Sequence, residues 1–217
     1  MGDKIQHAYK ASKNIYDDVL TQGSFFSRLY IRLFWSGTDD REIARSVLSC
    51  IPADFGGALL DVPVGTAVFT AQAWRGLNNA SITCLDHSRD MLAEARARLS
   101  GCRHISFVQG DVGALPFADG AFDIVFSMNG FHAFPDKEKA FSETARVLKP
   151  GGAFIGCFYI RGKSKITDLL VKCVLAKKGW FTPPFQTEEE LRRRLTQIYR
   201  TAQLHTDGSI AWFRCVK

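Results

Sequence analysis

Residues 58–67 read Ala-Leu-Leu-Asp-Val-Pro-Val-Gly-Thr-Ala, and this stretch decides the fold. The apolar run Ala58–Val62, with one aspartate in it, is typical of a short buried β-strand. Gly65 follows in a tight turn, and Thr66–Trp74 has the composition of a helix that Gly76 ends. A strand that passes through a glycine turn into a helix is the opening of an α/β unit, so the sequence predicts one here.

The same alternation of strand and helix continues along the chain. Ser88 and Asp136 are typical N-terminal caps, so a helix is expected after each, and Lys149-Pro150-Gly151-Gly152 is expected to end the second one. Short loops between such elements favour a parallel sheet that helices cover on both faces. The predicted strands are Ser81–Asp86, Ile105–Gln109, Phe122–Met128 and Ala153–Tyr159.

The C-terminal part predicts a helix and a hairpin. Thr187 and Glu190 have the spacing of a capping box for a helix to about Leu195. Strands at Ile198–His205 and Ile210–Val216 flank an Asp-Gly turn, so these two should pair antiparallel. The expected fold is therefore α/β, a doubly wound, mostly parallel, seven-stranded sheet with an antiparallel C-terminal hairpin.

Length and composition are those of one ordinary globular domain. The chain has 217 residues, of which 46% are hydrophobic and 23% charged, and its longest apolar run is far shorter than the ~18 residues of a membrane span. Scattered cysteines and the absence of a secretory signal at the start favour a cytoplasmic protein with reduced thiols. We expect one domain over 1–217, with a helical lid at 1–52, a core at 58–159, and helices and a hairpin at 160–217.

Basic residues are concentrated in the last third of the chain. The net charge is +6, and between Arg161 and Arg200 ten Lys or Arg face four acids. A solvated helix face is the favoured interpretation, and there is no strong signal for nucleic acid. The segment Ile166–Phe185 combines basic and apolar residues, so it could shape an acceptor pocket or make peripheral contact with a membrane.

Three carboxylates end three successive predicted strands: Asp61, Asp86 and Asp111. Because the carboxyl ends of parallel strands meet at one edge of a sheet, these side chains should lie near each other. Asp86 follows Gly65 by 21 residues, which suits a carboxylate that binds both hydroxyls of an unphosphorylated ribose. Asp111 could accept a hydrogen bond from the exocyclic amine of adenine. Taken singly, each also fits a structural role, as a helix cap beside Ser88 or as a turn residue.

With these residues the chain resembles a known family. The run LLDVPVGTAVF…CLDHSRDML…FVQGDVGALPFADGAFDIVFSMNGFHAFPDKEKAFSETARVLKPGG is similar to class I S-adenosylmethionine-dependent methyltransferases. The small-molecule branch with the ubiquinone/menaquinone-biosynthesis C-methyltransferases resembles it most, over 58–159. Lys13–Asp17 is similar to a short motif ahead of that core. The sequence departs from the family's acidic-x-Gly-x-Gly-x-Gly motif, because Pro63 and Ala67 replace its first and third glycines.

The resemblance implies S-adenosylmethionine as cofactor, S-adenosylhomocysteine as product and no metal. Asp86 would bind the ribose and Asp111 the adenine edge. The other contacts that the resemblance implies are Asp61, Pro63, Val64, Gly65 and Thr66 for the methionine moiety, His87, Met91 and Val112 near the adenine, and Ser127, Met128 and Asn129 beside the transferable methyl group.

The implied activity is methyl transfer by in-line displacement to a small-molecule acceptor, apolar or quinone-like. His132 is the candidate general base if the acceptor must lose a proton, although a packed loop histidine is the alternative. An RNA or protein methyltransferase and a non-catalytic cofactor-binding protein of the same fold are the other readings. Aromatic residues near the expected mouth could form an apolar lid or ordinary core: Tyr9, Tyr16, Phe25, Phe26 and Trp35.

Overall fold

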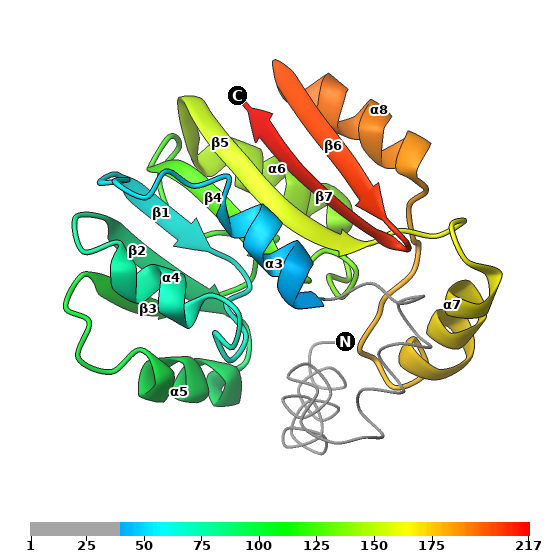
Figure 1. The fold of residues 1–217 in the computed structure, drawn as a ribbon, viewed down its shortest axis with the longest axis horizontal. Helices are drawn as coiled ribbons and strands as arrows, with labels where there is room; N and C mark the ends of the chain where they lie inside the picture. Colours follow the sequence, from blue (N-terminus) through cyan, green and yellow to red (C-terminus); the bar gives the residue numbers. More distant parts are fainter. Residues whose placement is uncertain (1–39) are drawn as a thin grey trace.

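A computed structural model describes residues 40–217, and these form a seven-stranded sheet in the order β3-β2-β1-β4-β5-β7-β6 (Figure 1). β1 to β5 pair in parallel, and β7 lies antiparallel between β5 and β6. The predicted fold class is therefore confirmed, including the antiparallel hairpin. The strands are β1 Ala58–Asp61, β2 Ser81–Asp86, β3 Ile105–Gln109, β4 Phe122–Met128, β5 Leu148–Tyr159, β6 Thr201–Asp207 and β7 Ile210–Val216.

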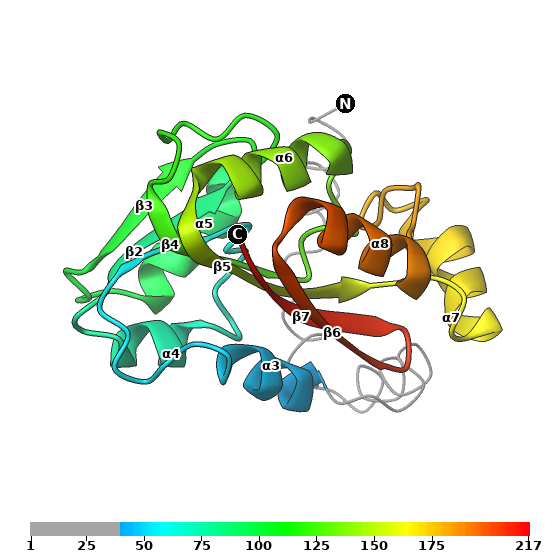
Figure 2. The same ribbon diagram turned by 90° about the horizontal axis from the view of Figure 1, so that it is seen from above.

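Helices cover both faces of this sheet, as Figure 2 shows for α3 and α4 on one side and α6 and α8 on the other. α7 and the π-helical turn η1 follow the carboxyl end of β5 and extend beyond the sheet (Figure 1). The helices are α3 Asp40–Leu48, α4 Ala71–Gly76, α5 Arg89–Arg98, α6 Lys137–Val147, α7 Lys165–Leu170, η1 Val171–Leu175 and α8 Glu188–Ile198.

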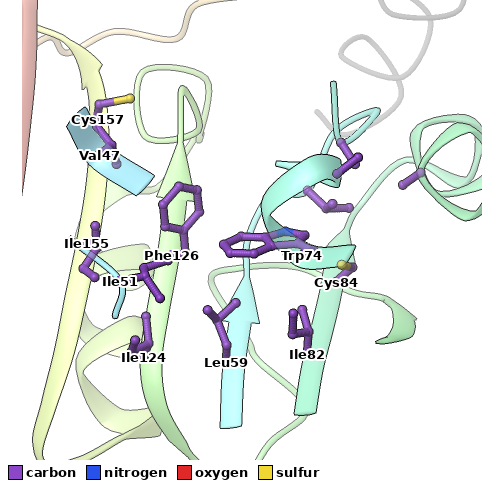
Figure 3. Packing of buried hydrophobic residues seen from close by; sticks show 14 of the residues in the cluster. Val47, Ile51, Leu59, Trp74, Ile82, Cys84, Ile124, Phe126, Ile155 and Cys157 are labelled. Carbon is purple, nitrogen blue, oxygen red and sulfur yellow. The ribbon is translucent and has the colours of Figure 1, made fainter. Parts of the chain in front are cut away.

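Two hydrophobic cores lie on the two faces, because successive side chains of a strand point to opposite sides. In β1, Leu59 packs in the core under α3, α4 and α5, whereas Leu60 packs in the core under α6 and α8. Figure 3 shows the first core, where Trp74 of α4 lies over the sheet with Phe126 of β4, at 5.2 Å between ring centroids. Because helices cover both faces of the sheet, the sequences of its strands are nearly continuous runs of apolar residues.

The predicted helix caps are confirmed. The Ser88 hydroxyl accepts from the Met91 N–H, and the Asp136 carboxylate accepts from the Lys139 N–H. Thr187 forms a capping box with its third helical residue. Each cap depends on residues within one turn, which is why the sequence pattern was sufficient to locate it.

The predicted starts of one helix and one strand were wrong. The helix predicted over Thr66–Trp74 begins only at Ala71, because Ala67 has φ of 57°, a left-handed conformation that an α-helix cannot contain. β5 begins at Leu148 rather than Ala153, since Leu148 already pairs with Phe122 of β4.

Two further boundaries near the C-terminus shifted by about a turn. α8 ends at Ile198 and β6 begins at Thr201, each about three residues beyond the expected position. The expected N-terminal lid, its aromatic residues and the Lys13–Asp17 motif lie outside the described residues, apart from α3. Among residues 40–217, no helix is long and apolar enough to cross a bilayer.

Candidate functional site

A cavity of about 420 Å³ lies at the carboxyl ends of β1, β2 and β4, within the size range of small-molecule sites. The loops after β1, β2, β3 and β4 form its wall. The predicted cofactor residues that line it are Asp61, Pro63, Val64, Gly65, Thr66, Asp86, His87, Met91, Asp111, Val112, Met128 and Asn129. The structure therefore brings together side chains that are up to 68 positions apart in the sequence, as expected for parallel strands that end at one edge.

Asp86 is a buried carboxylate that two backbone N–H groups hold in place. Its Oδ2 accepts from Gly65 N at 2.9 Å and its Oδ1 from Ser88 N at 2.8 Å. Burial raises the pKa of Asp86 to about 6, although these N–H groups lower it in part. A carboxylate can accept about four hydrogen bonds, so two acceptor positions are left for hydroxyl groups of a ligand.

Asp61 is also buried, and both of its donors meet the same oxygen. Trp74 Nε1 donates to Oδ2 at 2.7 Å and Thr70 Oγ1 donates to it at 3.3 Å. No described residue donates to Oδ1. Burial, and to a smaller extent the negative charge of Asp86, raise the pKa of Asp61 to about 7, although the two donors lower it in part. This free oxygen at the cavity suits a cationic group of a ligand.

Trp74 and Thr70 were missed by the sequence analysis. Both belong to the stretch assigned to an ordinary helix, and the indole ring is fully buried. Their side chains reach back to the strand nine and thirteen residues earlier, a contact that no local pattern signals.

The turn after β1 approaches the loop after β4 very closely. A Cβ on Gly130 would lie 2.2 Å from Pro63 Cδ, so a side chain cannot be fitted there. Gly65 has φ of 55°, and a Cβ on it would meet no atom within 4 Å, which leaves open space beside the cavity. Two positions thus need glycine, one for close packing and one for backbone conformation.

The third strand-end carboxylate, Asp111, belongs to a local turn. Its Oδ1 accepts from Gly113 N at 2.8 Å, as in the turn interpretation, and the side chain is exposed while it lines the cavity. The two roles are compatible, because its other oxygen remains available.

Ser127 is the one predicted cofactor residue that does not line the cavity. It is buried in β4 beside Met128, and its hydroxyl has no hydrogen-bond partner among the described residues. Met128 lines the cavity because successive side chains of a strand point to opposite faces, and Asn129, which lies just after the end of β4, lines it too.

His132 also lies outside the cavity lining. Its ring stacks on Phe181 with centroids 3.9 Å apart, and its Nδ1 accepts from Tyr159 N at 3.4 Å. Burial and, to a smaller extent, the nearby Lys137 charge lower the pKa of His132 to about 3. A buried, neutral imidazole in this position matches the packed histidine that was the alternative interpretation, and it is a poor general base.

The loop after β4 is anchored to the segment after η1. Thr182 N donates to His132 O at 2.8 Å, and Thr182 Oγ1 donates to Ala133 O at 2.9 Å. The buried Lys137 joins the carbonyl groups of Phe134 and Thr182. Three residues of this loop line the cavity, and sequence reasoning missed all of them: Ala133, Phe134 and Pro135.

The cavity's charges define the class of ligand that fits it. Three carboxylates, Asp61, Asp86 and Asp111, line it, and within the described residues no Lys or Arg does. A ligand with several phosphates would meet repulsion there, whereas a cationic ligand with hydroxyl groups would be attracted.

Comparison with known proteins agrees with this geometry. Residues 59–152 match a family model described as a methyltransferase domain. This match covers less than half of the chain, from β1 to the start of β5, and it includes the strands whose carboxyl ends line the cavity.

Among curated relatives, a demethylmenaquinone methyltransferase from Clavibacter sepedonicus is 36% identical over 102 residues, which are 47% of this chain and 41% of that protein. The chain spans about half, or less, of the length of the curated relatives that it matches.

Solved structures share the fold at low sequence identity. An S-adenosylmethionine-dependent methyltransferase from Thermotoga maritima has a TM-score of 0.69 at 18% identity and covers 98% of this chain and 99% of its own. Phosphoethanolamine N-methyltransferase 2 from Haemonchus contortus, solved in complex with S-adenosyl-L-methionine, also has a TM-score of 0.69, at 17% identity, over 87% of this chain and 56% of that one. The fold is therefore that of methyltransferases with differing acceptors.

Proposed function

We propose that this protein is an S-adenosylmethionine-dependent methyltransferase that acts on a small-molecule acceptor. The observation that carries the proposal is the cavity itself, with two buried carboxylates, an exposed third and no Lys or Arg among the described residues that line it. S-adenosylmethionine supplies, when bound, a methyl group on a sulfonium sulfur, together with a ribose, an adenine and an amino acid end.

The residues of the cavity fit each part of this cofactor. Asp86 keeps two acceptor positions for the ribose hydroxyls, and Asp111 with the Val112 N–H would read the adenine edge. His87 and Met91 would pack beside the adenine. Asp61 and the backbone of 63–66 would hold the amino acid end, where the free Oδ1 suits an ammonium group. Met128 and Asn129, at the end of β4, would flank the methyl group.

The protein's contribution to the reaction is alignment and exclusion of water. Displacement at a sulfonium needs the acceptor atom in line with a leaving group that is already activated, and proximity alone can lower the barrier by roughly 7–11 kcal/mol. His132 has no part in this proposal, because it lies outside the cavity and is neutral. An acceptor that is already deprotonated, or that loses its proton to water, needs no side-chain base.

An apolar, quinone-like acceptor is the chemistry that the lining supports best. Much of the wall is apolar, with Val64, Phe69, Met91, Met128 and Phe134 among its residues. The Clavibacter sepedonicus relative is named for demethylmenaquinone. Both points favour a flat apolar substrate over a nucleic acid or a protein.

Calorimetric titration with S-adenosylmethionine and S-adenosylhomocysteine tests the cofactor assignment. Wild type should bind both, and Asp86→Ala should lose at least about tenfold in affinity, because two hydrogen bonds to a charged acceptor disappear. Asp54→Ala is the matched control, since it removes an exposed carboxylate in the loop before β1, away from the cavity lining. Absence of binding in wild type, or equal binding in Asp86→Ala, would overturn the proposal.

The acceptor class needs a separate assay. Transfer of labelled methyl groups from S-adenosylmethionine should be detected with reduced naphthoquinones or benzoquinones that lack one ring methyl group. Transfer to total RNA or to denatured protein, with none to these quinols, would assign the other acceptor class.

A further inference from the structure

The segment after β5 exposes two large apolar side chains to solvent. Ile166 is 67% exposed and Leu169 is 61% exposed, and no other large hydrophobic residue of the described part of the chain is exposed. They lie three residues apart in α7, hence on one face. The opposite face is formed by Thr167, Val171 and Leu175, which are buried against the protein. This segment is therefore amphipathic, and within residues 40–217 its second apolar face has no partner.

Positive charge surrounds the exposed pair. Residues 161–178 contain six Lys or Arg and one acid, and two of the six, Arg161 and Lys163, form ion pairs with glutamates of α8. Lys165 and Lys172 lie one turn before and one turn after Leu169, and both are exposed. Within residues 40–217 neither forms an ion pair. The one acid, Asp168, accepts from Tyr159 OH at 2.6 Å and from Gly162 N at 2.9 Å, so the protein itself engages it.

We propose that this face, formed by Lys165, Ile166, Leu169 and Lys172, docks on the surface of an anionic lipid bilayer. Apolar side chains of such a face enter the boundary between headgroups and acyl chains, while flanking lysines contact lipid phosphates. A protein partner would need acidic groups arranged around an apolar socket. A bilayer presents both a negative surface and an apolar layer to any such helix, so the observed combination fits it without further assumptions.

The position of the face in the fold supports this partner. α7 follows the carboxyl end of β5, which is parallel to β4 (Figure 1). α7 therefore lies beyond the edge of the sheet at which the carboxyl ends of β1, β2 and β4 line the cavity. The segment after η1 is joined to the cavity wall through the two hydrogen bonds of Thr182 to the loop after β4. A docked molecule thus holds its cavity near the lipid surface. The docking itself does not depend on the proposed methyl transfer.

Flotation with lipid vesicles tests the proposal. The wild-type chain should float with vesicles of phosphatidylcholine that contain one third phosphatidylglycerol, and poorly with phosphatidylcholine alone. Ile166→Ser/Leu169→Ser should lower the partition coefficient about tenfold, because the apolar contribution is removed. Lys165→Glu/Lys172→Glu should lower the partition coefficient about 25-fold or more, because each lysine lost lowers it about fivefold.

Matched controls separate a local docking face from the overall charge. Arg193→Glu/Arg200→Glu makes the same change of charge at exposed positions in and just after α8, so it should change partition less than about twofold. Circular dichroism and thermal unfolding report whether each variant keeps its fold, which is expected because the substituted side chains are exposed.

Three results would overturn the docking face. In the first, wild type fails to float with anionic vesicles, and in the second, the lysine and arginine variants lose partition equally. In the third, sedimentation shows a dimer that Ile166→Ser/Leu169→Ser dissociates while no chain binds vesicles, and the face then belongs to a second copy. Failure of the methyltransferase assignment would leave vesicle binding unchanged, so the two proposals fail separately.

Discussion

The buried carboxylate Asp86 predicts a specific pH dependence of ligand affinity. A suitable test ligand is 5′-methylthioadenosine, which carries the adenine and ribose of the cofactor but no amino acid end. Its affinity therefore depends on the proposed ribose contact of Asp86 and not on the proposed contact of Asp61 with an amino acid end. In the folded protein burial raises the pKa of Asp86 from its ordinary 3.8 to about 6. Ribose hydroxyls donate to the carboxylate form, and that form is lost as the pH falls through 6. Affinity should therefore be high above pH 6 and decline below it.

The size of the effect follows from the pKa. At pH 5 a group of pKa 6 is about ten-elevenths protonated, so the apparent Kd should rise about tenfold between pH 8 and pH 5. A carboxyl with the ordinary value of 3.8 would change Kd by less than about a tenth over the same range. The expected loss is an upper limit, because a protonated carboxyl still accepts hydrogen bonds weakly.

Isothermal titration at pH 8, 7, 6 and 5 measures this curve. Asp86→Asn should bind more weakly at pH 8 and show a flat profile, whereas Asp54→Asn should reproduce the wild-type curve. The reasoning would be refuted by a constant wild-type Kd, or by the same tenfold rise in Asp86→Asn, since the titrating group would then lie elsewhere.

Three further substitutions test the site. Gly130→Ala places a Cβ 2.2 Å from Pro63 Cδ, so the free energy of unfolding measured with denaturant should fall by about 1–3 kcal/mol. A glycine-to-alanine change at an open position should not cause this loss. Trp74→Phe removes the indole donor to Asp61, which should cost about 2 kcal/mol of stability and weaken S-adenosylhomocysteine binding. In the folded protein the pKa of His132 is about 3, below its ordinary 6.5, so the unfolded chain binds a proton that the folded protein does not. As the pH falls below 6.5, the free energy of unfolding of wild type should therefore decrease by about 1.4 kcal/mol per pH unit relative to His132→Phe, which lacks this group. Equal slopes of unfolding free energy against pH in the two proteins would contradict the burial argument.

Gly76→Ala provides the open position for comparison. A Cβ there meets no atom within 4 Å and the backbone is helical, so stability should stay equal or rise by up to about 1 kcal/mol. A loss in Gly76→Ala as large as that in Gly130→Ala would show that the close approach to Pro63 is not the cause.

Helix boundaries separate what local patterns can predict from what they cannot. Ser88, Asp136 and Thr187 were identified as caps because a cap is a contact within one turn. The start of α4 was wrong because the turn before it is shaped by distant contacts, where Thr70 and Trp74 donate to Asp61 of β1. Composition alone made Thr66–Trp74 look helical, and tertiary bonds overrode it.

By itself the sequence determined the alternation of strands and helices, the hairpin and the strand ends that carry Asp61, Asp86 and Asp111, because each depends on hydrophobic period, turn chemistry and neighbouring residues. Only the tertiary structure decided that His132 lies packed against Phe181, away from the cavity. It also decided which carboxylate oxygens stay free and that Ile166 and its neighbour Leu169 remain uncovered. These features depend on which distant side chains meet after the sheet has formed, and no local window of sequence contains both partners.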